Sequence, residues 1–136
     1  METENLYNLA ETQGISLDFF PMPKNLSAAV AFGGKYFIAL DPLVLGSSAL
    51  ERVCLAHELG HCETGSTYNM YYPLDLRAKH ENRANKWAVD TLIPLSDLEG
   101  AIKNGYRDIC SLAEYFSVTE DFMKKAIDIY KNNLSF

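Results

Sequence analysis

Cysteine and positive charge are both scarce in this chain, and each scarcity argues against a class of protein. The 136 residues include three histidines and three cysteines. The cysteines, Cys54, Cys62 and Cys110, cannot all pair with one another, so we expect reduced thiols rather than the disulfide framework of a small secreted domain. Twelve Lys and Arg against 18 Asp and Glu give a formal net charge of -6. Because this charge repels a phosphate backbone, direct nucleic-acid binding is disfavoured.

Long hydrophobic runs are missing as well. No segment reaches the roughly 18 consecutive apolar residues that a membrane-spanning helix requires. The N-terminal stretch METENLYNLAETQG is acidic, and it lacks the basic flank and the apolar run of a secretory signal. We therefore predict a soluble, cytoplasmic protein with no membrane partner.

The chain nevertheless has a hydrophobic fraction of 48%, which is enough for one compact domain with a buried core. We predict a single domain over residues 1–136, with a metal-binding core over 1–94 and a helical part over 95–136. The predicted fold class is α+β: mostly helical, with a short antiparallel β-hairpin or sheet packed against a central helix.

Local patterns place the individual elements. Apolar spacing indicates a helix over residues 6–10 and a strand over 15–19. Gly33 and Gly34 separate two apolar runs and predict a hairpin with strands over 29–32 and 35–40. Further helices are expected over 48–64, over 80–93 and, as three short segments, over 95–136, whereas Ser66–Lys79, which contains Pro73, is expected to be a long loop.

The segment CLAHELGHC, residues 54–62, belongs to the central helix, where Ser48 and Glu51 have the spacing of a capping box. At 3.6 residues per turn, His57 and His61 lie on one face about 6 Å apart along the axis, so their imidazoles can bind one metal ion. Glu58 lies about 100° around the helix, outside the ligand face but near enough to a water at the metal to act as a general base. His-Glu-x-x-His also arises by chance in about one chain of this size in two hundred, so a structural histidine pair is the alternative.

A catalytic zinc site usually takes three ligands from the protein, so a third residue is required. The longer pattern H-E-x-x-H-x-x-G-x-x-H fails here, because Thr64 and Thr67 stand where glycine and histidine are needed. Glu81 is the better candidate. It shares a helix face with Ala84 and Ala88, whose small side chains allow the two helices to approach closely.

Several other residues near the motif are candidates for supporting roles. Asn85, one turn after Glu81, can orient His57 or His61 through the other ring nitrogen. His80 competes with Glu81 as a ligand, but an exposed histidine at the helix start is favoured. Cys62 is expected to be inert and Glu63 to face water. The candidates for contacts to substrate or to a developing oxyanion are Tyr71, Tyr72 and His80, with Tyr68 and Arg77 beside them and aromatic packing as the alternative for the tyrosines.

The two motifs together resemble the ImmA/IrrE family of metallopeptidases. The first is HELGH, and the second, Glu81 to Pro94, reads E-x-x-A-N-x-[FW]-A-x-x-x-L-[IM]-P. The resemblance is clear over residues 29–94 and looser in the C-terminal helices. The chain departs from the family pattern at Trp87, where phenylalanine is usual, and at Arg83, where many members carry an acid. Neither position is a predicted ligand.

This resemblance implies a zincin-like fold, in which the HELGH helix packs against a small sheet. It also implies one zinc ion per chain, held by His57, His61 and Glu81, with Glu58 as the catalytic base. Family members are typically encoded by bacteria or phages, and several cleave a transcriptional repressor. A helix-turn-helix repressor is therefore the expected substrate. An extended substrate can pair with the hairpin edge near Lys35 to Ala39.

Two other functions stay open. In the first, the metal only stabilises the fold, and the protein is a non-catalytic regulator that binds a partner through its tyrosine-rich loop or its C-terminal helices. In the second, residues 108–130 form a DNA-reading helix-turn-helix. The second is less favoured, because Ser117 stands where a turn glycine is usual and acidic residues offset the lysines. The sequence does not distinguish zinc from manganese, although two imidazoles and one carboxylate favour zinc.

Overall fold

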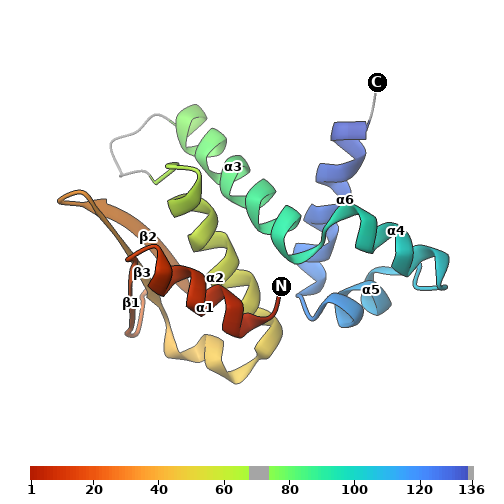
Figure 1. The fold of residues 1–136 in the computed structure, drawn as a ribbon, viewed down its shortest axis with the longest axis horizontal. Helices are drawn as coiled ribbons and strands as arrows, with labels where there is room; N and C mark the ends of the chain where they lie inside the picture. Colours follow the sequence, from red (N-terminus) through yellow and green to blue (C-terminus); the bar gives the residue numbers. More distant parts are fainter. Residues whose placement is uncertain (68–73, 135–136) are drawn as a thin grey trace.

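The computed structural model describes residues 1–67 and 74–134 and confirms the α+β class (Figure 1). Over these residues, a small three-stranded sheet lies at one side of a mostly helical fold. In this part of the chain, no helix combines the length and the apolar character that crossing a membrane requires. The elements are α1 (Thr3–Thr12), β1 (Ser16–Phe19), β2 (Ser27–Phe32), β3 (Lys35–Leu40), the 3-10 helix η1 (Pro42–Gly46), α2 (Ser48–Glu63), α3 (Leu74–Leu92), α4 (Leu95–Lys103), α5 (Ile109–Phe116) and α6 (Glu120–Leu134).

The sheet has the strand order β1-β3-β2. The predicted hairpin is present as β2 and β3, and both turn glycines, Gly33 and Gly34, have positive φ angles of 60° and 77°. Strand β1 pairs with β3 in parallel, so the sheet is mixed and not purely antiparallel as predicted. Because β3 is hydrogen-bonded on both sides, the prediction that Lys35 to Ala39 form an open edge is wrong. Among the described residues β1 and β2 each pair with β3 alone, so the two open edges of the sheet belong to β1 and β2.

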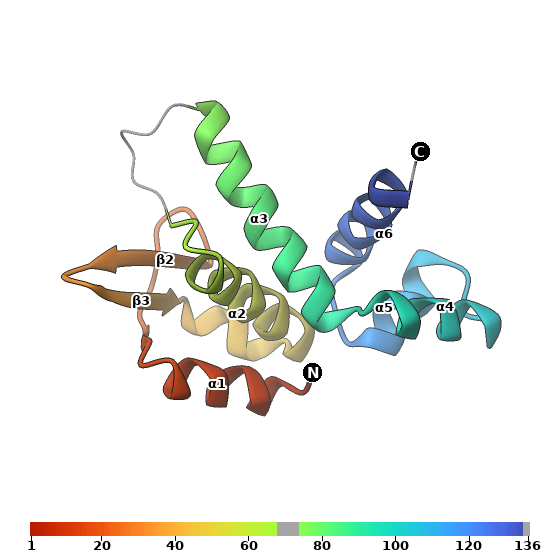
Figure 2. The same ribbon diagram turned by 45° about the horizontal axis from the view of Figure 1, so that its top comes forward.

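Helix α2 lies between the sheet and α3 (Figures 1 and 2). Alternation along β3 turns Ile38 and Leu40 inward, where both are buried. Leu55 and Leu59 of α2 are fully buried in the same core. The helix that carries the histidines is therefore fixed on two sides, one facing the sheet and one facing α3.

Helices α2 and α3 approach each other unusually closely at Gly60. A Cβ atom placed on Gly60 would lie 2.5 Å from the carbonyl oxygen of Ala84, so only glycine fits without a shift of the backbone. Ala84 and Ala88 are completely buried at this contact. The small-residue face predicted for the second helix is thus the face on which the two helices meet.

We expect Gly60→Ala to lower the free energy of unfolding by about 1–3 kcal/mol, because the new methyl group must push the helices apart. Gly100→Ala on α4 is a matched control, since a Cβ there meets no atom within 4 Å. The control should be neutral or stabilise by up to about 1 kcal/mol through helix propensity. Denaturant unfolding of both variants measures the difference, and equal effects would contradict the close packing.

Two helix starts differ from their predictions. Helix α3 begins at Leu74, so residues 74–79 are helical and not part of a loop. Pro73 was interpreted as a breaker, but proline is also common at helix starts. The capping box at Ser48 and Glu51 is absent: Ser47 is the N-cap and accepts from the Leu50 amide at 3.3 Å. Glu51 instead accepts a 2.5 Å hydrogen bond from the Tyr7 hydroxyl.

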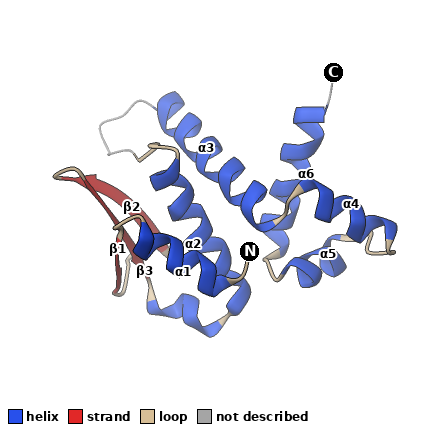
Figure 3. Ribbon diagram, viewed as in Figure 1, coloured by secondary structure: helices blue, strands red, loops and turns tan. Residues whose placement is uncertain are grey.

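The helices α4, α5 and α6 form the end of the molecule away from the strands (Figure 3). Turns with positive φ at Gly105 and Ser117 separate them, so the three short helices predicted over 95–136 are present. Ser117 has φ 55° and is the one non-glycine residue with positive φ in the part of the chain described. Its carbonyl oxygen accepts a 3.1 Å hydrogen bond from Arg52 of α2, whose guanidinium also lies 3.4 Å from the Phe116 oxygen. Arg52 therefore ties the C-terminal helices to the helix that carries the histidines.

Candidate metal centre

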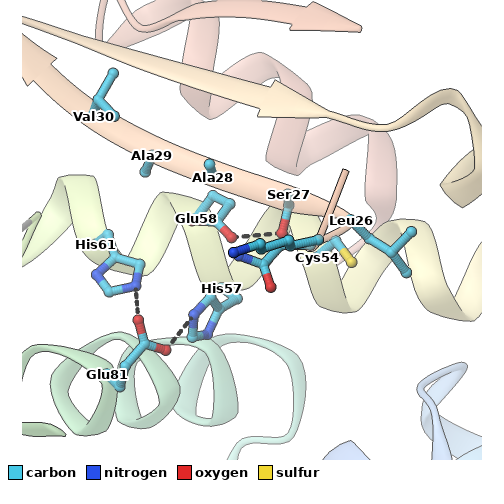
Figure 4. A pocket seen from close by; sticks show the side chains of 12 residues that line it. Leu26, Ser27, Ala28, Ala29, Val30, Cys54, His57, Glu58, His61 and Glu81 are labelled. Carbon is cyan, nitrogen blue, oxygen red and sulfur yellow. Dashed lines mark hydrogen bonds and ion pairs between the residues drawn. The ribbon is translucent and has the colours of Figure 1, made fainter. Parts of the chain in front are cut away.

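One turn of α2 and one turn of α3 bring three potential metal ligands together (Figure 4). His57 and His61 lie on the face of α2 that meets α3, and Glu81 reaches toward both from α3. The carboxylate oxygens of Glu81 lie 2.9 Å from His57 Nε2 and 2.9 Å from His61 Nε2. All three ligand atoms lie within 4.8 Å of one another. The structure thus places the three predicted ligands side by side.

Hydrogen bonds on the far side of each ring fix which nitrogen faces Glu81. His61 Nδ1 lies 2.9 Å from the carbonyl oxygen of Ser66, which can only accept, so Nδ1 carries the hydrogen. His57 Nδ1 lies 2.8 Å from Asn85 Oδ1 and is oriented in the same way. Both Nε2 atoms are therefore available as ligands, as in metal sites whose histidines are held by a second hydrogen bond. Two imidazole nitrogens and one carboxylate oxygen fit a catalytic zinc ion.

The charge of Glu81 also suits a cation. Burial raises the pKa of Glu81, but hydrogen bonds with His57 and His61 outweigh it, and the pKa lies well below its usual range. Burial lowers the pKa of His61, but its hydrogen bonds with Glu81 and the Ser66 carbonyl raise the pKa above the ordinary value. Glu81 is therefore a carboxylate at neutral pH, and its negative charge faces the two ring nitrogens.

Glu58 lies beside this group without joining it. Its side chain is only 5% exposed, and burial raises its pKa, opposed by His57 and by a hydrogen bond from Ser27. The hydroxyl of Ser27, on β2, donates to Glu58 Oε2 at 2.5 Å. A cavity of about 540 Å³ opens on Glu58 and the three ligands, and Leu26 with the start of β2, residues 27–30, forms its opposite wall (Figure 4). A buried carboxylate, a ligand group and a strand edge therefore share one cavity.

Ser27 and Ser66 are site residues that the sequence reasoning missed. Ser27, on β2, donates a hydrogen bond to Glu58 of α2, and the backbone carbonyl oxygen of Ser66 accepts one from His61. The isolated polar Ser27 in the otherwise apolar strand SAAVAF was the available signal, but its partner depends on which strand lies over α2.

The remaining candidates have different outcomes. Tyr71 and Tyr72, with Tyr68, lie outside the described residues. His80 is buried, 8% exposed, and lies well inside α3, so the prediction of an exposed histidine at the helix start is wrong. The cause is the early start of α3 at Leu74. His80 is not among the described residues that line the cavity, and its contact to substrate stays a prediction.

Cys62 and Glu63 lie where the sequence suggested. Cys62 is buried at the end of α2, and burial raises the pKa of its thiol to about 12. Such a thiol stays protonated, which agrees with an inert packing role. Glu63 is exposed.

Comparison with known protein families decides the classification. Residues 10–128 match the family model Peptidase_M78, described as the IrrE N-terminal-like domain. The chain belongs to this family. The resemblance inferred from the two motifs is therefore confirmed, and the Peptidase_M78 match extends beyond the motifs to most of the chain. No curated protein matches the chain. Membership of Peptidase_M78 makes this a metallopeptidase-type domain, with His57, His61 and Glu81 as a group able to bind a metal ion.

Proposed function

We propose that the protein is a zinc-dependent endopeptidase that cleaves a regulatory protein, namely a helix-turn-helix repressor of a phage or mobile element. The observation that carries this proposal is the buried carboxylate of Glu58 in the same cavity as the three-ligand group. A metal that only stabilised the fold would need no such neighbour. A repressor substrate would also place the protein in the cytoplasm.

His57, His61 and Glu81 would hold the zinc ion, which when bound supplies Lewis-acid activation of a water molecule and of the scissile carbonyl. Glu58 accepts the proton of the attacking water and passes it to the leaving amine. Burial raises the pKa of Glu58 toward neutral pH, which suits a group that must both take and give a proton. Asn85 and Ser66 keep the two imidazoles in place.

The open edge of β2 supports binding of an extended substrate. An added strand finds unpaired backbone groups along this edge, and Ala28, Ala29 and Val30 of β2 line the cavity beside Glu58. Their small side chains leave room for the substrate backbone. We propose that Tyr71 and Tyr72 contact the substrate or its developing oxyanion from the segment between α2 and α3.

The experiment that tests the function is incubation of the zinc-loaded protein with the repressor encoded next to it. We expect a small number of defined fragments by mass spectrometry, with cleavage stopped by a chelator and restored by zinc. A repressor that binds but stays intact would favour the non-catalytic regulator instead.

Ser27 gives a further test of the proposed mechanism. We expect Ser27→Ala to lower kcat by roughly tenfold, because a hydrogen bond to a charged group contributes about 1.5–3 kcal/mol and here it orients the general base. Zinc affinity should stay unchanged. Ser27→Thr keeps the hydroxyl and should restore most of the rate. Steady-state kinetics of both variants measures the effect, and an unchanged kcat in Ser27→Ala would remove Ser27 from the mechanism.

A further inference from the structure

A second cavity lies on the other side of α3 from the metal centre. It is a groove of about 490 Å³ between α3 and the second half of α6, two helices that diverge toward their outer ends (Figures 1 and 2). We call it the α3–α6 groove. Four asparagines and two lysines dominate its lining: Asn82, Asn85 and Lys86 from α3, with Lys125, Asn132 and Asn133 from α6.

The charge of these two helices differs from that of the remaining chain. They carry seven of the twelve Lys and Arg but six of the 18 Asp and Glu, a formal charge of +1, whereas the rest of the chain has -7. Two of those acids are already occupied. Glu81 faces the histidines, and Asp90 pairs with Lys86 at 3.0 Å. Asp128 also lines the groove, but no ion pair of Lys125 is found among the described residues. The lining itself thus holds two lysines, one of them paired with Asp90, and one acid, Asp128, in a protein with a net charge of -6.

The asparagines indicate what kind of group binds there. Each side-chain amide offers a donor and an acceptor, which matches a peptide backbone and polar side chains. A ligand that is acidic as well would gain from the exposed ammonium group of Lys125. An apolar helix would find few partners, because among the described residues of the lining Ile129 alone is aliphatic.

Asn85 connects the groove with the metal centre. Its side chain lines the groove, and its Oδ1 accepts from His57 Nδ1 at 2.8 Å. Helix α3 is thus a shared wall, with the cavity of Glu58 on one side and the groove on the other. We propose that the α3–α6 groove docks an acidic, polar segment of the protein substrate, outside the segment that is cleaved. The identity of this partner as the substrate rests on the proposed function.

The test uses amide NMR of the full chain carrying Glu58→Gln, so that it requires no cleavage. The probes are a Glu- and Ser-rich peptide, a Lys- and Ser-rich peptide of equal length, and a short duplex DNA. We expect the acidic peptide alone to shift the side-chain amide signals of Asn82, Asn85, Asn132 and Asn133, and to bind more weakly as salt is added.

Lys125→Glu should weaken binding of the acidic peptide at least about threefold, as expected for reversing an exposed charge. Lys103→Glu, an exposed change on α4, is the matched control and should have no effect. Shifts spread over the surface, or equal shifts from the basic peptide, would overturn the proposal. Tighter binding of DNA in the groove would overturn it in favour of a nucleic-acid surface. If the repressor is not cleaved, the proposed function is refuted, but binding of the acidic peptide in the groove is unaffected.

Discussion

Glu58→Gln should abolish cleavage of the repressor while the protein still binds one zinc ion. The expected loss in kcat is about 10²- to 10⁴-fold, the usual contribution of a general base. Glutamine has nearly the same size, and its carbonyl oxygen can still accept the hydrogen bond from Ser27. It cannot take a proton from water. Glu58 also lies outside the ligand group, so its loss should not release the metal.

The matched control for this variant is Glu63→Gln, one to two turns further along α2. Glu63 is exposed, so Glu63→Gln should change neither the cleavage nor the zinc content of the protein. Cleavage is followed by mass spectrometry of the fragments, and zinc by elemental analysis of the purified protein. Retained cleavage in Glu58→Gln would exclude Glu58 as the base. Loss of zinc in that variant would show that Glu58 is a ligand.

Glu81→Ala should weaken zinc binding at least about 100-fold. Even groups that only orient a ligand change metal affinity by about 10- to 100-fold, and Glu81 would be one of three direct ligands. It is also the carboxylate that faces both imidazoles at 2.9 Å. Without it, two nitrogens remain and no compensating negative charge is left within the group.

Competition with a chromophoric chelator measures this affinity. Asp90→Ala is the control on the same helix, because Asp90 is exposed and pairs with Lys86 on the surface. His80→Ala tests the competing ligand considered from the sequence. Unchanged affinity in Glu81→Ala, combined with a loss in His80→Ala, would reassign the third ligand to His80.

The parts of the site that could be predicted are those that local geometry determines. His57 and His61 share a face because helix periodicity places i and i+4 together. Glu81 was identified because Ala84 and Ala88 mark the side of α3 that lies close to another helix. The structure brings these residues together as expected, and the family match confirms the class of domain to which the motifs belong.

The parts that could not be predicted depend on contacts between distant elements. The parallel pairing of β1 with β3 leaves no periodic signal in the sequence, so the sequence does not show that β3 is the central strand. Ser27 could be recognised as a partner of Glu58 only after β2 was placed over α2. His80 is buried inside α3 because this helix begins at Leu74, whereas Pro73 in the sequence favoured a later helix start.

Ser117 shows how a local rule can be overridden. Its identity argued against a helix-turn-helix, since a turn glycine is usual there, yet it adopts φ 55° between α5 and α6. Hydrogen bonds from Arg52 to the carbonyl oxygens of Ser117 and Phe116 hold this turn against α2. A tertiary contact thus stabilises a backbone conformation that the side chain alone disfavours. The turn geometry therefore gives no information on DNA binding.

The most direct test of the metal centre is a crystal structure of the zinc-loaded protein with anomalous diffraction data collected at the zinc edge. We predict one zinc ion per chain, about 2.0–2.2 Å from the Nε2 atoms of His57 and His61 and from a carboxylate oxygen of Glu81. The carboxylate of Glu58 should lie outside the ligand set. A zinc ion at another position, or one bound by Glu58 in place of Glu81, would contradict the assignment of ligands and base.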